Sequence, residues 1–267
     1  MILPSADGVS LILALAAAIA YAVLAWTGAR AGQWGARSIA IVAWVLHGMA
    51  LGWALFGGAS RFGFAPAISV TVWLAMLVYA VESHWLPQLP VRWKLGWLAA
   101  AAVLLALVFP GNLLASAASI WLPLHWALGI AAYGLFGVAV AHGWFMTKAD
   151  RRFRLAGEPQ SGVPLLMLER LTFRFVMAGF VLLSATLLVV MLFGKQLYGA
   201  HTVWRWDHKT VFSVLAWLTF AVLLLGRARF GWRGRVAVRV LYAGSGLLML
   251  AYVGSRFVME VVLGRTP

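Results

Sequence analysis

The sequence predicts an all-α membrane protein, a polytopic bundle of eight transmembrane helices with both termini outside the cytoplasm. The chain of 267 residues is 64% hydrophobic and only 10% charged, with a mean hydropathy of +0.92. A soluble domain of this composition would lack the polar surface that water requires. The apolar residues also form runs close to the length of about 20 residues that crosses a bilayer. The lysines and arginines, finally, gather in alternate connections between these runs.

Eight apolar segments define the expected helices. The first has no basic residue before it, since residues 1–8 carry only Asp7. A cleaved signal peptide normally begins with basic residues, so we expect a retained helix whose N-terminus lies outside. The predicted segments are 9–28, 38–57, 66–86, 93–109, 121–147, 172–194, 209–226 and 237–258.

The distribution of basic residues predicts the orientation. The connections that follow the first, third, fifth and seventh segments hold, with their flanks, 15 of the 21 lysines and arginines. The positive-inside rule places these connections in the cytoplasm and both termini outside it. The formal charge of +14 therefore needs no nucleic acid to explain it. In the longest cytoplasmic connection, 148–171, we expect irregular structure and a short interfacial helix that begins at Pro164.

No separate soluble domain fits between the segments, so we expect one domain over residues 1–267. The chain has no cysteine, which excludes disulfides and thiolate metal sites. We find no Gly-rich phosphate loop and no paired-carboxylate site.

The densest group of aromatic and ionisable residues is the stretch 199–217, GAHTVWRWDHKTVFSVLAW, which the orientation places in an outer loop and at the start of the seventh helix. Aromatic rings and cations side by side can serve a large, flat anionic ligand. They are equally typical of a loop anchored at the headgroups. The candidate binding residues here are Trp204, Arg205, Trp206, Asp207, His208 and Lys209.

The histidines fall at different depths. His125 lies near the outer end of the fifth segment, and His208 begins the seventh, so the two can face each other across a pocket in the outer leaflet. His47 lies near the bilayer centre, where a polar side chain either has a function or bonds to a neighbouring helix. For His84 and His142, near inner helix ends, we expect interhelical bonds.

An iron porphyrin fits these groups. Neutral imidazole is a common axial ligand, aromatic walls suit the macrocycle, and cations suit its propionates. The candidate iron ligands are therefore His125, His208 and His47. If a pair binds iron from opposite faces, His125 and His208 should lie within roughly 10 Å of each other.

A resemblance to a known family rests on several motifs. The run WRWDHK at 204–209, Trp217, Arg227, GWRG at 231–234 and Tyr252 together resemble the tryptophan-rich WWD signature of cytochrome c assembly proteins, the haem handlers CcsA and CcmC. Leu124 and His125, followed by Tyr133, are similar to the histidine helix of that family. Similarity to the eight-helix YpjD and HemX-like branch lies in LERLTFR at 168–174, HKTV at 208–211 and GSRF at 254–257 with Glu260.

The resemblance implies a multi-pass protein of the bacterial inner membrane that binds or passes haem on the extracytoplasmic face, through His125 with His208 or His47. It implies no bond-making chemistry and so no enzyme. Two departures favour an alternative. The family's histidine after the signature helix is replaced near Leu225, and the one after the last helix is missing at 261–264.

The alternative is a haem-free regulatory or partner subunit that keeps the fold and docks another membrane protein or a haem-synthesis enzyme. A small-solute carrier is disfavoured, because we see no repeated halves with broken helices.

Overall fold

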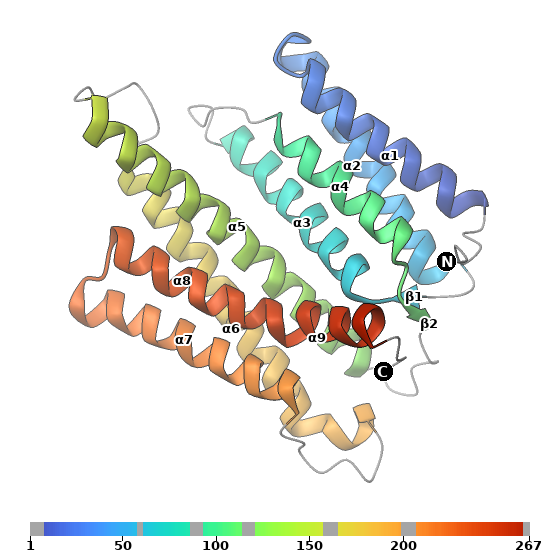
Figure 1. Ribbon diagram of the computed structural model, residues 1–267. Helices are drawn as coiled ribbons and strands as arrows, with labels where there is room; N and C mark the ends of the chain where they lie inside the picture. Colours follow the sequence, from blue (N-terminus) through green and yellow to red (C-terminus); the bar gives the residue numbers. More distant parts are fainter. Residues whose placement is uncertain are drawn as a thin grey trace. The chain divides into compact units, whose positions relative to one another are not determined.

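The computed structural model describes residues 8–57, 61–85, 93–113, 121–156, 165–198 and 207–263. All eight predicted segments form helices, which confirms the all-α prediction (Figure 1). Among the described residues, seven helices are long and apolar enough to cross a membrane. The helix predicted at 93–109 has 14 residues, Leu95–Val108, which is shorter than a usual span. The count of eight spans and the sides of the termini stay predictions.

The chain divides into two compact units, and the boundary near its C-terminal end falls between Ser255 and Arg256. Unit 1 contains the first four helices: α1 (Gly8–Thr27), α2 (Gly32–Phe56), α3 (Phe64–Trp85) and α4 (Leu95–Val108). Unit 2 contains the next four: α5 (Trp121–Ala156), α6 (Leu165–Tyr198), α7 (His208–Phe230) and α8 (Gly234–Met249). The prediction of one domain over residues 1–267 stays a prediction.

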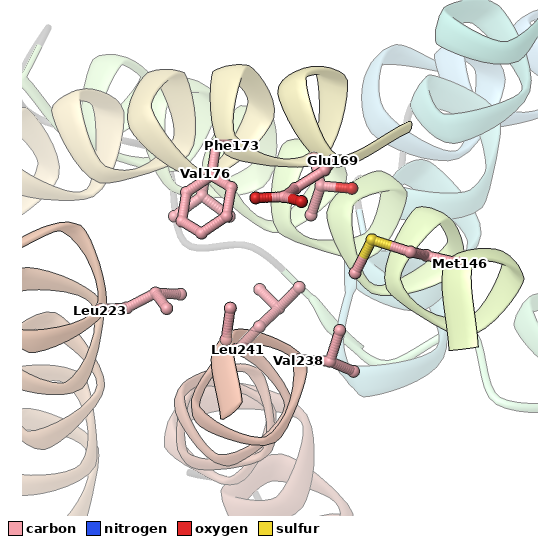
Figure 2. Close-up of a pocket in the computed structure, with 9 residues that line it drawn as sticks. Met146, Glu169, Phe173, Val176, Leu223, Val238 and Leu241 are labelled. Carbon is pink, nitrogen blue, oxygen red and sulfur yellow. The ribbon is translucent and has the colours of Figure 1, made fainter. Parts of the chain in front are cut away.

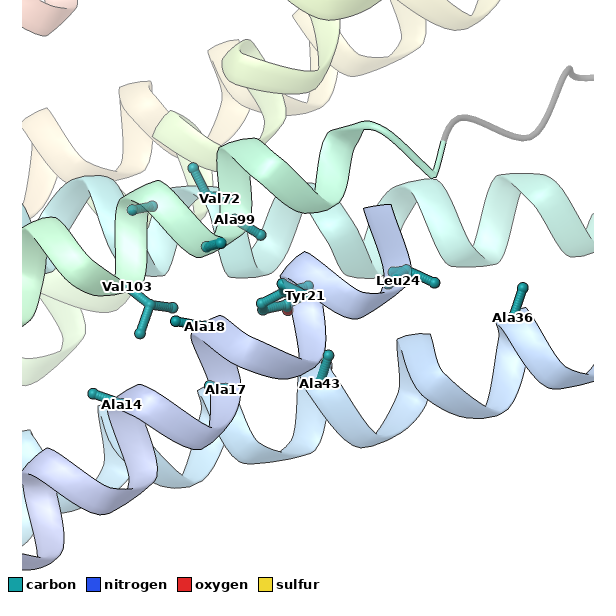
Figure 3. Packing of buried hydrophobic residues seen from close by; sticks show 12 residues of the cluster. Ala14, Ala17, Ala18, Tyr21, Leu24, Ala36, Ala43, Val72, Ala99 and Val103 are labelled. Atoms are coloured by element: carbon teal, nitrogen blue, oxygen red, sulfur yellow. The ribbon is translucent and has the colours of Figure 1, made fainter. Parts of the chain in front are cut away.

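Small residues bring the helices of unit 1 together. Ala14, Ala17 and Ala18 of α1 belong to its cluster of buried residues (Figure 3). Apolar side chains gain little by leaving lipid for a helix interface, so close backbone approach supplies much of the packing energy. α2 and α3 are held by two stacked indoles. Trp44 donates its N–H to the Trp73 carbonyl at 3.1 Å, and Trp73 donates to the Trp44 carbonyl at 2.9 Å.

Two short strands were not predicted. β1 (Arg61–Phe62) pairs antiparallel with β2 (Asn112–Leu113). Gly111, just before β2, has a φ of +82° and lies against the Phe62 backbone, where a Cβ would clash. Strands of two residues leave no periodic pattern in a sequence, which explains why they were missed.

Unit 2 is built around stacked aromatic rings. Phe136 of α5 and Phe220 of α7 stack with ring centroids 3.8 Å apart. Gly179 of α6 and Gly244 of α8 lie against these rings, so a side chain at either glycine would crowd the stack. α5 packs on α6 and α8, and α7 packs on the same two helices.

The secondary structure differs most from the prediction in the connection 148–171, where we expected irregular structure and a short interfacial helix. α5 continues to Ala156, and Leu165 begins an unbroken helix of 34 residues, so the separate interfacial helix from Pro164 is wrong. No Gly or Pro interrupts residues 165–178, and Leu168 and Glu169 are buried against the bundle. The segment therefore extends the span in phase instead of lying on the membrane surface. Residues 157–164 lie outside the described residues.

The last helix also runs further than predicted. α8 passes into a π-helical turn, η1 (Leu250–Gly254), then α9 (Ser255–Phe257) and a second π-helical turn, η2 (Val258–Val262). π-helical turns are rare and concentrate at functional sites, because they turn side chains and carbonyls out of the regular ladder.

Candidate functional site

Unit 2 has two ends of different chemistry. At the histidine end, α5 and α7 begin and α6 ends. At the arginine end, α5 and α7 end and α6 and α8 begin. His125 and His208 lie at the first, whereas the cations of 148–151 and 227–239 lie at the second.

α7 begins at an N-cap that the sequence encodes directly. The Asp207 carboxylate accepts a 2.9 Å bond from the Thr210 backbone N–H, which satisfies one of the donors left open at a helix start. Burial acts to raise the pKa of Asp207, but the bonds from Thr210 and the charges of Lys209 and His208 outweigh it and lower the pKa. The carboxylate therefore stays ionised and fixes the first turn, which carries His208.

His208 contacts the end of the last helix. Its Nε2 lies 2.7 Å from the Ser255 hydroxyl, which follows the π-helical turn η1. The Ser255 side chain is buried, whereas His208 is exposed on its other sides. A hydroxyl can donate or accept, so this bond holds the ring and leaves its tautomer open.

His125 has its tautomer set by the backbone. Its Nδ1 lies 3.3 Å from the Thr186 carbonyl oxygen of α6. A carbonyl only accepts, so the neutral ring must carry its proton on Nδ1, which leaves the lone pair on Nε2. This is the usual state of a metal-binding histidine, whose other ring nitrogen donates to a carbonyl or carboxylate.

The two histidines lie at about the same level of unit 2. α5 and α8 run antiparallel, because Gly143 packs against Leu241 while the Tyr133 hydroxyl donates to the Leu248 carbonyl. His125 precedes Tyr133 by eight residues, about 12 Å along a helix, and Ser255 follows Leu248 by seven, about 10 Å. His125 and Ser255, the partner of His208, are therefore at similar height.

This register brings His125 and His208 to one end of the unit. That these two histidines lie within roughly 10 Å of each other stays a prediction.

Aromatic rings lie one turn before His125, at the start of α5. Trp121 precedes it by four residues, so both share one face of α5, and its ring stacks on Phe193 of α6 at a centroid distance of 3.7 Å. Further from the histidine end, Trp217 stacks on Phe180 and donates its indole N–H to Ser184. These flat walls were not predicted as a set, because their partners lie far apart in the sequence.

His47 lies in unit 1 and is fully engaged. It is buried, with Nε2 2.8 Å from the Ser69 hydroxyl and Nδ1 3.4 Å from the Tyr21 hydroxyl. Both nitrogens therefore tie α2 to neighbouring helices, and this favours the interhelical alternative for His47. His142 is likewise buried between helices, against the Phe175 ring.

The other predicted site residues lie at the start of α7 and in the stretch before it. Lys209 lies in the first turn of α7 and is partly exposed. Trp204, Arg205 and Trp206 lie outside the described residues, as does the side chain of His84. Within the ranges described, no group of three or more His, Cys, Asp or Glu side chains is arranged to hold a metal ion. One or two imidazoles, which suffice for a porphyrin iron, are compatible with that.

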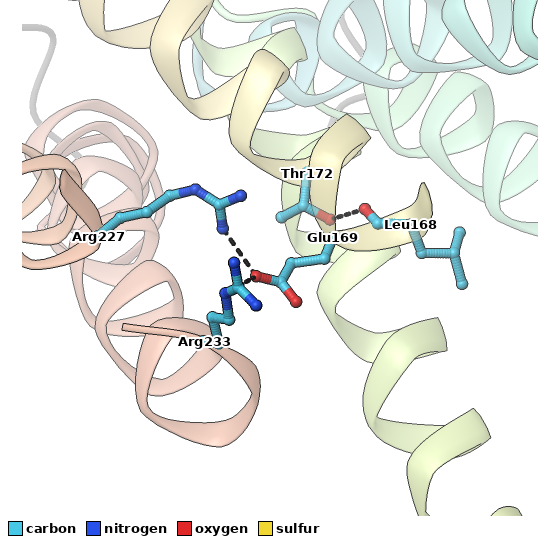
Figure 4. A network of polar contacts seen from close by, with 5 residues as sticks. All are labelled: Leu168, Glu169, Thr172, Arg227 and Arg233. Atoms are coloured by element: carbon cyan, nitrogen blue, oxygen red, sulfur yellow. Dashed lines mark hydrogen bonds and ion pairs between the residues drawn. The ribbon is translucent and has the colours of Figure 1, made fainter. Parts of the chain in front are cut away.

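Sequence reasoning missed a polar network at the arginine end. Glu169 of α6 is buried and accepts a 2.7 Å bond from Arg227 of α7, while Arg233 lies 3.7 Å from the same carboxylate oxygen (Figure 4). The Arg227 guanidinium also lies 3.7 Å over the Phe173 ring. Glu169 forms one polar wall of a small apolar pocket between α5, α6, α7 and α8 (Figure 2). Glu169 is the one acid in the largely apolar run 164–178, and this was the available signal.

Comparison with known proteins adds the family. The model of the family described as "Cytochrome C assembly protein" matches residues 10–263. The chain is 37% identical over 99 residues to the Inner membrane protein YpjD of Escherichia coli K12, a match that covers 37% of this chain and 36% of YpjD. It is 30% identical over 225 residues to an uncharacterized 28.8 kDa protein of Azospirillum brasilense, over 79% of this chain and 81% of that protein.

A further relative is the Cytochrome c biogenesis protein CcsA of Prochlorococcus marinus MED4, 23% identical over 226 residues, or 80% of this chain and 68% of CcsA. No solved structure matches the chain. The aligned stretch spans about a third of YpjD. These matches confirm the resemblance found in the sequence. With the seven apolar helices, they identify a multi-pass protein of the bacterial inner membrane.

Proposed function

This chain belongs to the cytochrome c assembly protein family, and on that premise we propose that it binds or passes haem on the extracytoplasmic face of the membrane. His125 is the primary iron ligand, and His208 is the second. The haem is cargo, which the protein holds and orients without making or breaking bonds, so the proposal assigns handling and no catalysis. Eight spans with both termini outside the cytoplasm belong to the same proposal, because they put the histidine end outside.

The observation that carries the proposal is the bond between His125 Nδ1 and the Thr186 carbonyl. It fixes the ring orientation and leaves a neutral Nε2 with a lone pair, which is the state that coordinates iron. A histidine that only tied α5 to α6 could make the same bond. The stacked pair of Trp121 and Phe193 one turn away adds the flat apolar wall that a macrocycle needs.

His208 and His47 differ in how their ring nitrogens are already hydrogen-bonded. Ser255 engages Nε2 of His208, so Nδ1 is the nitrogen assigned to the ligand role. His47 would have to break its bond with Ser69 or Tyr21 before it met iron, so it ranks third. Of the other residues that the sequence predicts for this site, Trp204 and Trp206 would flank the porphyrin, Arg205 and Lys209 would pair with its propionates, and Asp207 caps the helix that carries His208.

A haem-free partner subunit remains the second candidate. This candidate is favoured because apolar residues stand where the family resemblance leads us to expect further histidines. Leu225 is 60% exposed on α7, and Val261 and Val262 end the last helix with apolar side chains. A protein with this fold and fewer ligands would dock another membrane protein or a haem-synthesis enzyme through its basic connections.

Haem titration of the purified protein separates the two candidates. We expect a Soret band on adding haem, and we expect His125→Ala to abolish or shift it. His142→Ala is the matched control, since it removes a histidine of the same helix about 25 Å from His125 and should leave the band unchanged. An interhelical hydrogen bond in a membrane contributes about 0.6 kcal/mol on average, so His125→Ala should stay folded.

If the wild-type protein stays colourless with haem added, the partner-subunit candidate replaces haem handling. A folded His125→Ala variant with an unchanged spectrum removes His125 as a ligand. Leu225→His should not by itself tighten binding, because the second histidine expected near 261–264 is also missing.

A further inference from the structure

One exposed face of α6 places two arginines inside an apolar stripe. Leu166, Arg170, Arg174, Met177 and Val181 follow one another at intervals of three and four residues, so they share one side of the helix. All five are exposed, with Leu166 at 61%, Met177 at 51% and Val181 at 58%. We call these five residues the α6 stripe. In a membrane-spanning helix, an exposed apolar stripe faces lipid.

The α6 stripe carries positive charge without a carboxylate of its own. Glu169 points to the other side of α6, where it is buried against Arg227. Arg174 lies about 12 Å along the helix from Leu166, one turn deeper than Arg170. A cation at such a depth is costly in hydrocarbon unless an anion or water reaches it. The anion within reach of a lipid-facing surface is a phospholipid phosphate.

We propose that Arg170 and Arg174 bind the phosphate of an anionic phospholipid. Their Cβ atoms are about 6 Å apart, as residues four apart on a helix are, so two guanidinium forks can meet one phosphate. The acyl chains then run along Met177 and Val181 towards the bilayer centre. The α6 stripe suits a phospholipid because its two arginines lie where the headgroup would be. The apolar residues Met177 and Val181 follow, where the acyl chains would be.

The surrounding charge selects an anionic headgroup over a zwitterionic one. The described residues at the arginine end hold nine lysine and arginine side chains against two carboxylates, Asp150 and Glu169. The positive end of a choline headgroup is repelled there, whereas a phosphatidylglycerol headgroup is not. The nine cations are Lys148, Arg151, Arg170, Arg174, Arg227, Arg229, Arg233, Arg235 and Arg239.

The chain lacks cysteine, so one fluorophore can report on the stripe. A Met177→Cys variant carrying a bimane label is reconstituted in bilayers of phosphatidylcholine with increasing phosphatidylglycerol, one or the other lipid having brominated chains that quench on contact. We expect brominated phosphatidylglycerol to quench more strongly than its bulk mole fraction predicts. Arg170→Gln and Arg174→Gln should each lower that preference about fivefold.

Arg239→Gln on α8 is the matched control, since it removes one exposed arginine at the same end but outside the α6 stripe, and it should lower the preference much less. The Arg170→Lys, Arg174→Lys double variant keeps the charge and should retain part of the preference. Equal quenching by both lipids, or an equal loss in Arg239→Gln, overturns the site. Competition by inorganic phosphate at constant ionic strength overturns the lipid assignment in favour of a free anion. Quenching by brominated phosphatidylcholine checks that the label contacts lipid in each variant, circular dichroism checks that each variant is folded, and no part of the measurement depends on haem.

Discussion

Replacement of Glu169 by alanine should destabilise unit 2. We expect most of the loss to come from the ion pair with Arg227 and little from the one with Arg233. Arg227 donates to the carboxylate at 2.7 Å, and its side chain is 28% exposed, whereas Arg233 approaches the same oxygen only to 3.7 Å and is 67% exposed. Both ion pairs join α6 to the neighbouring helices at the arginine end. Distance and exposure differ in the same direction, so the two coupling energies should differ as well.

Breaking a fully buried ion pair costs about 3–5 kcal/mol, and a hydrogen bond to a charged group contributes about 1.5–3 kcal/mol. Arg227 keeps more than a quarter of its side chain exposed, which lowers its share, so we expect a coupling of about 2 kcal/mol with Glu169. Arg233 resembles a surface pair, and we expect a coupling of about 0.5 kcal/mol with Glu169. Arg227→Ala also loses the contact with the Phe173 ring, which a single substitution cannot separate from the ion pair.

Double-mutant cycles isolate each pair from such losses. Glu169→Ala, Arg227→Ala, Arg233→Ala and the two double variants are unfolded reversibly in mixed micelles, and the free energies of unfolding are compared. A larger coupling for Arg227 than for Arg233 supports the geometry. Equal couplings, or a larger one for Arg233, would show that the carboxylate does not discriminate between its partners and would refute the reasoning.

Three further predictions concern other parts of the chain. Ser69→Ala should lower the free energy of unfolding by about 1 kcal/mol, because it leaves one nitrogen of buried His47 unpaired, and should leave any Soret band unchanged. Asp207→Ala should cost about 1 kcal/mol by removing the N-cap of α7. Because the folded pKa of Asp207 is lowered, the cap stabilises above the unfolded pKa, and the difference from wild type in chemical unfolding should close as pH falls through the folded pKa and stay constant between pH 6 and 8. Single cysteines at Asp207 and Arg152 should react with impermeant reagents from opposite sides of intact membranes; labelling from one side contradicts the orientation.

The spans were predictable because apolar runs of this length have few other uses. The ends of the helices were not, and the residues around Leu165 show why. A Pro–Leu start and two charges in 164–171 suggest a surface helix, but Leu168 and Glu169 are buried because Arg227, 58 residues away from Glu169, neutralises the acid. A contact of that separation leaves no pattern in the local sequence.

The candidate site was predictable in residue type and only partly in geometry. An imidazole four residues into a membrane helix pointed to His125, but its partner is the Thr186 carbonyl, a backbone group that any residue type supplies. In the sequence, Ser255 was only part of a motif that resembles the family. Its contact with His208 became visible in the structure. The turn η1 that precedes Ser255 was not predicted from the sequence.

The two ends of unit 2 are held by interactions of different strength, and this difference bears on where a cargo can enter. At the arginine end, a buried carboxylate, two arginines and an aromatic ring join three helices, and opening this end would leave the Glu169 carboxylate beside an apolar pocket without its close partner Arg227. At the histidine end, the hydrogen bond between His125 and Thr186 joins α5 to α6, and the one between His208 and Ser255 joins α7 to the end of the last helix. Each such bond contributes about 0.6 kcal/mol on average in a membrane protein, so the helices can part at this end at little cost while the ion-paired end keeps the bundle assembled. A site that must both accept and release a large planar molecule is better placed at the weaker end, and that is the end where His125 and His208 lie.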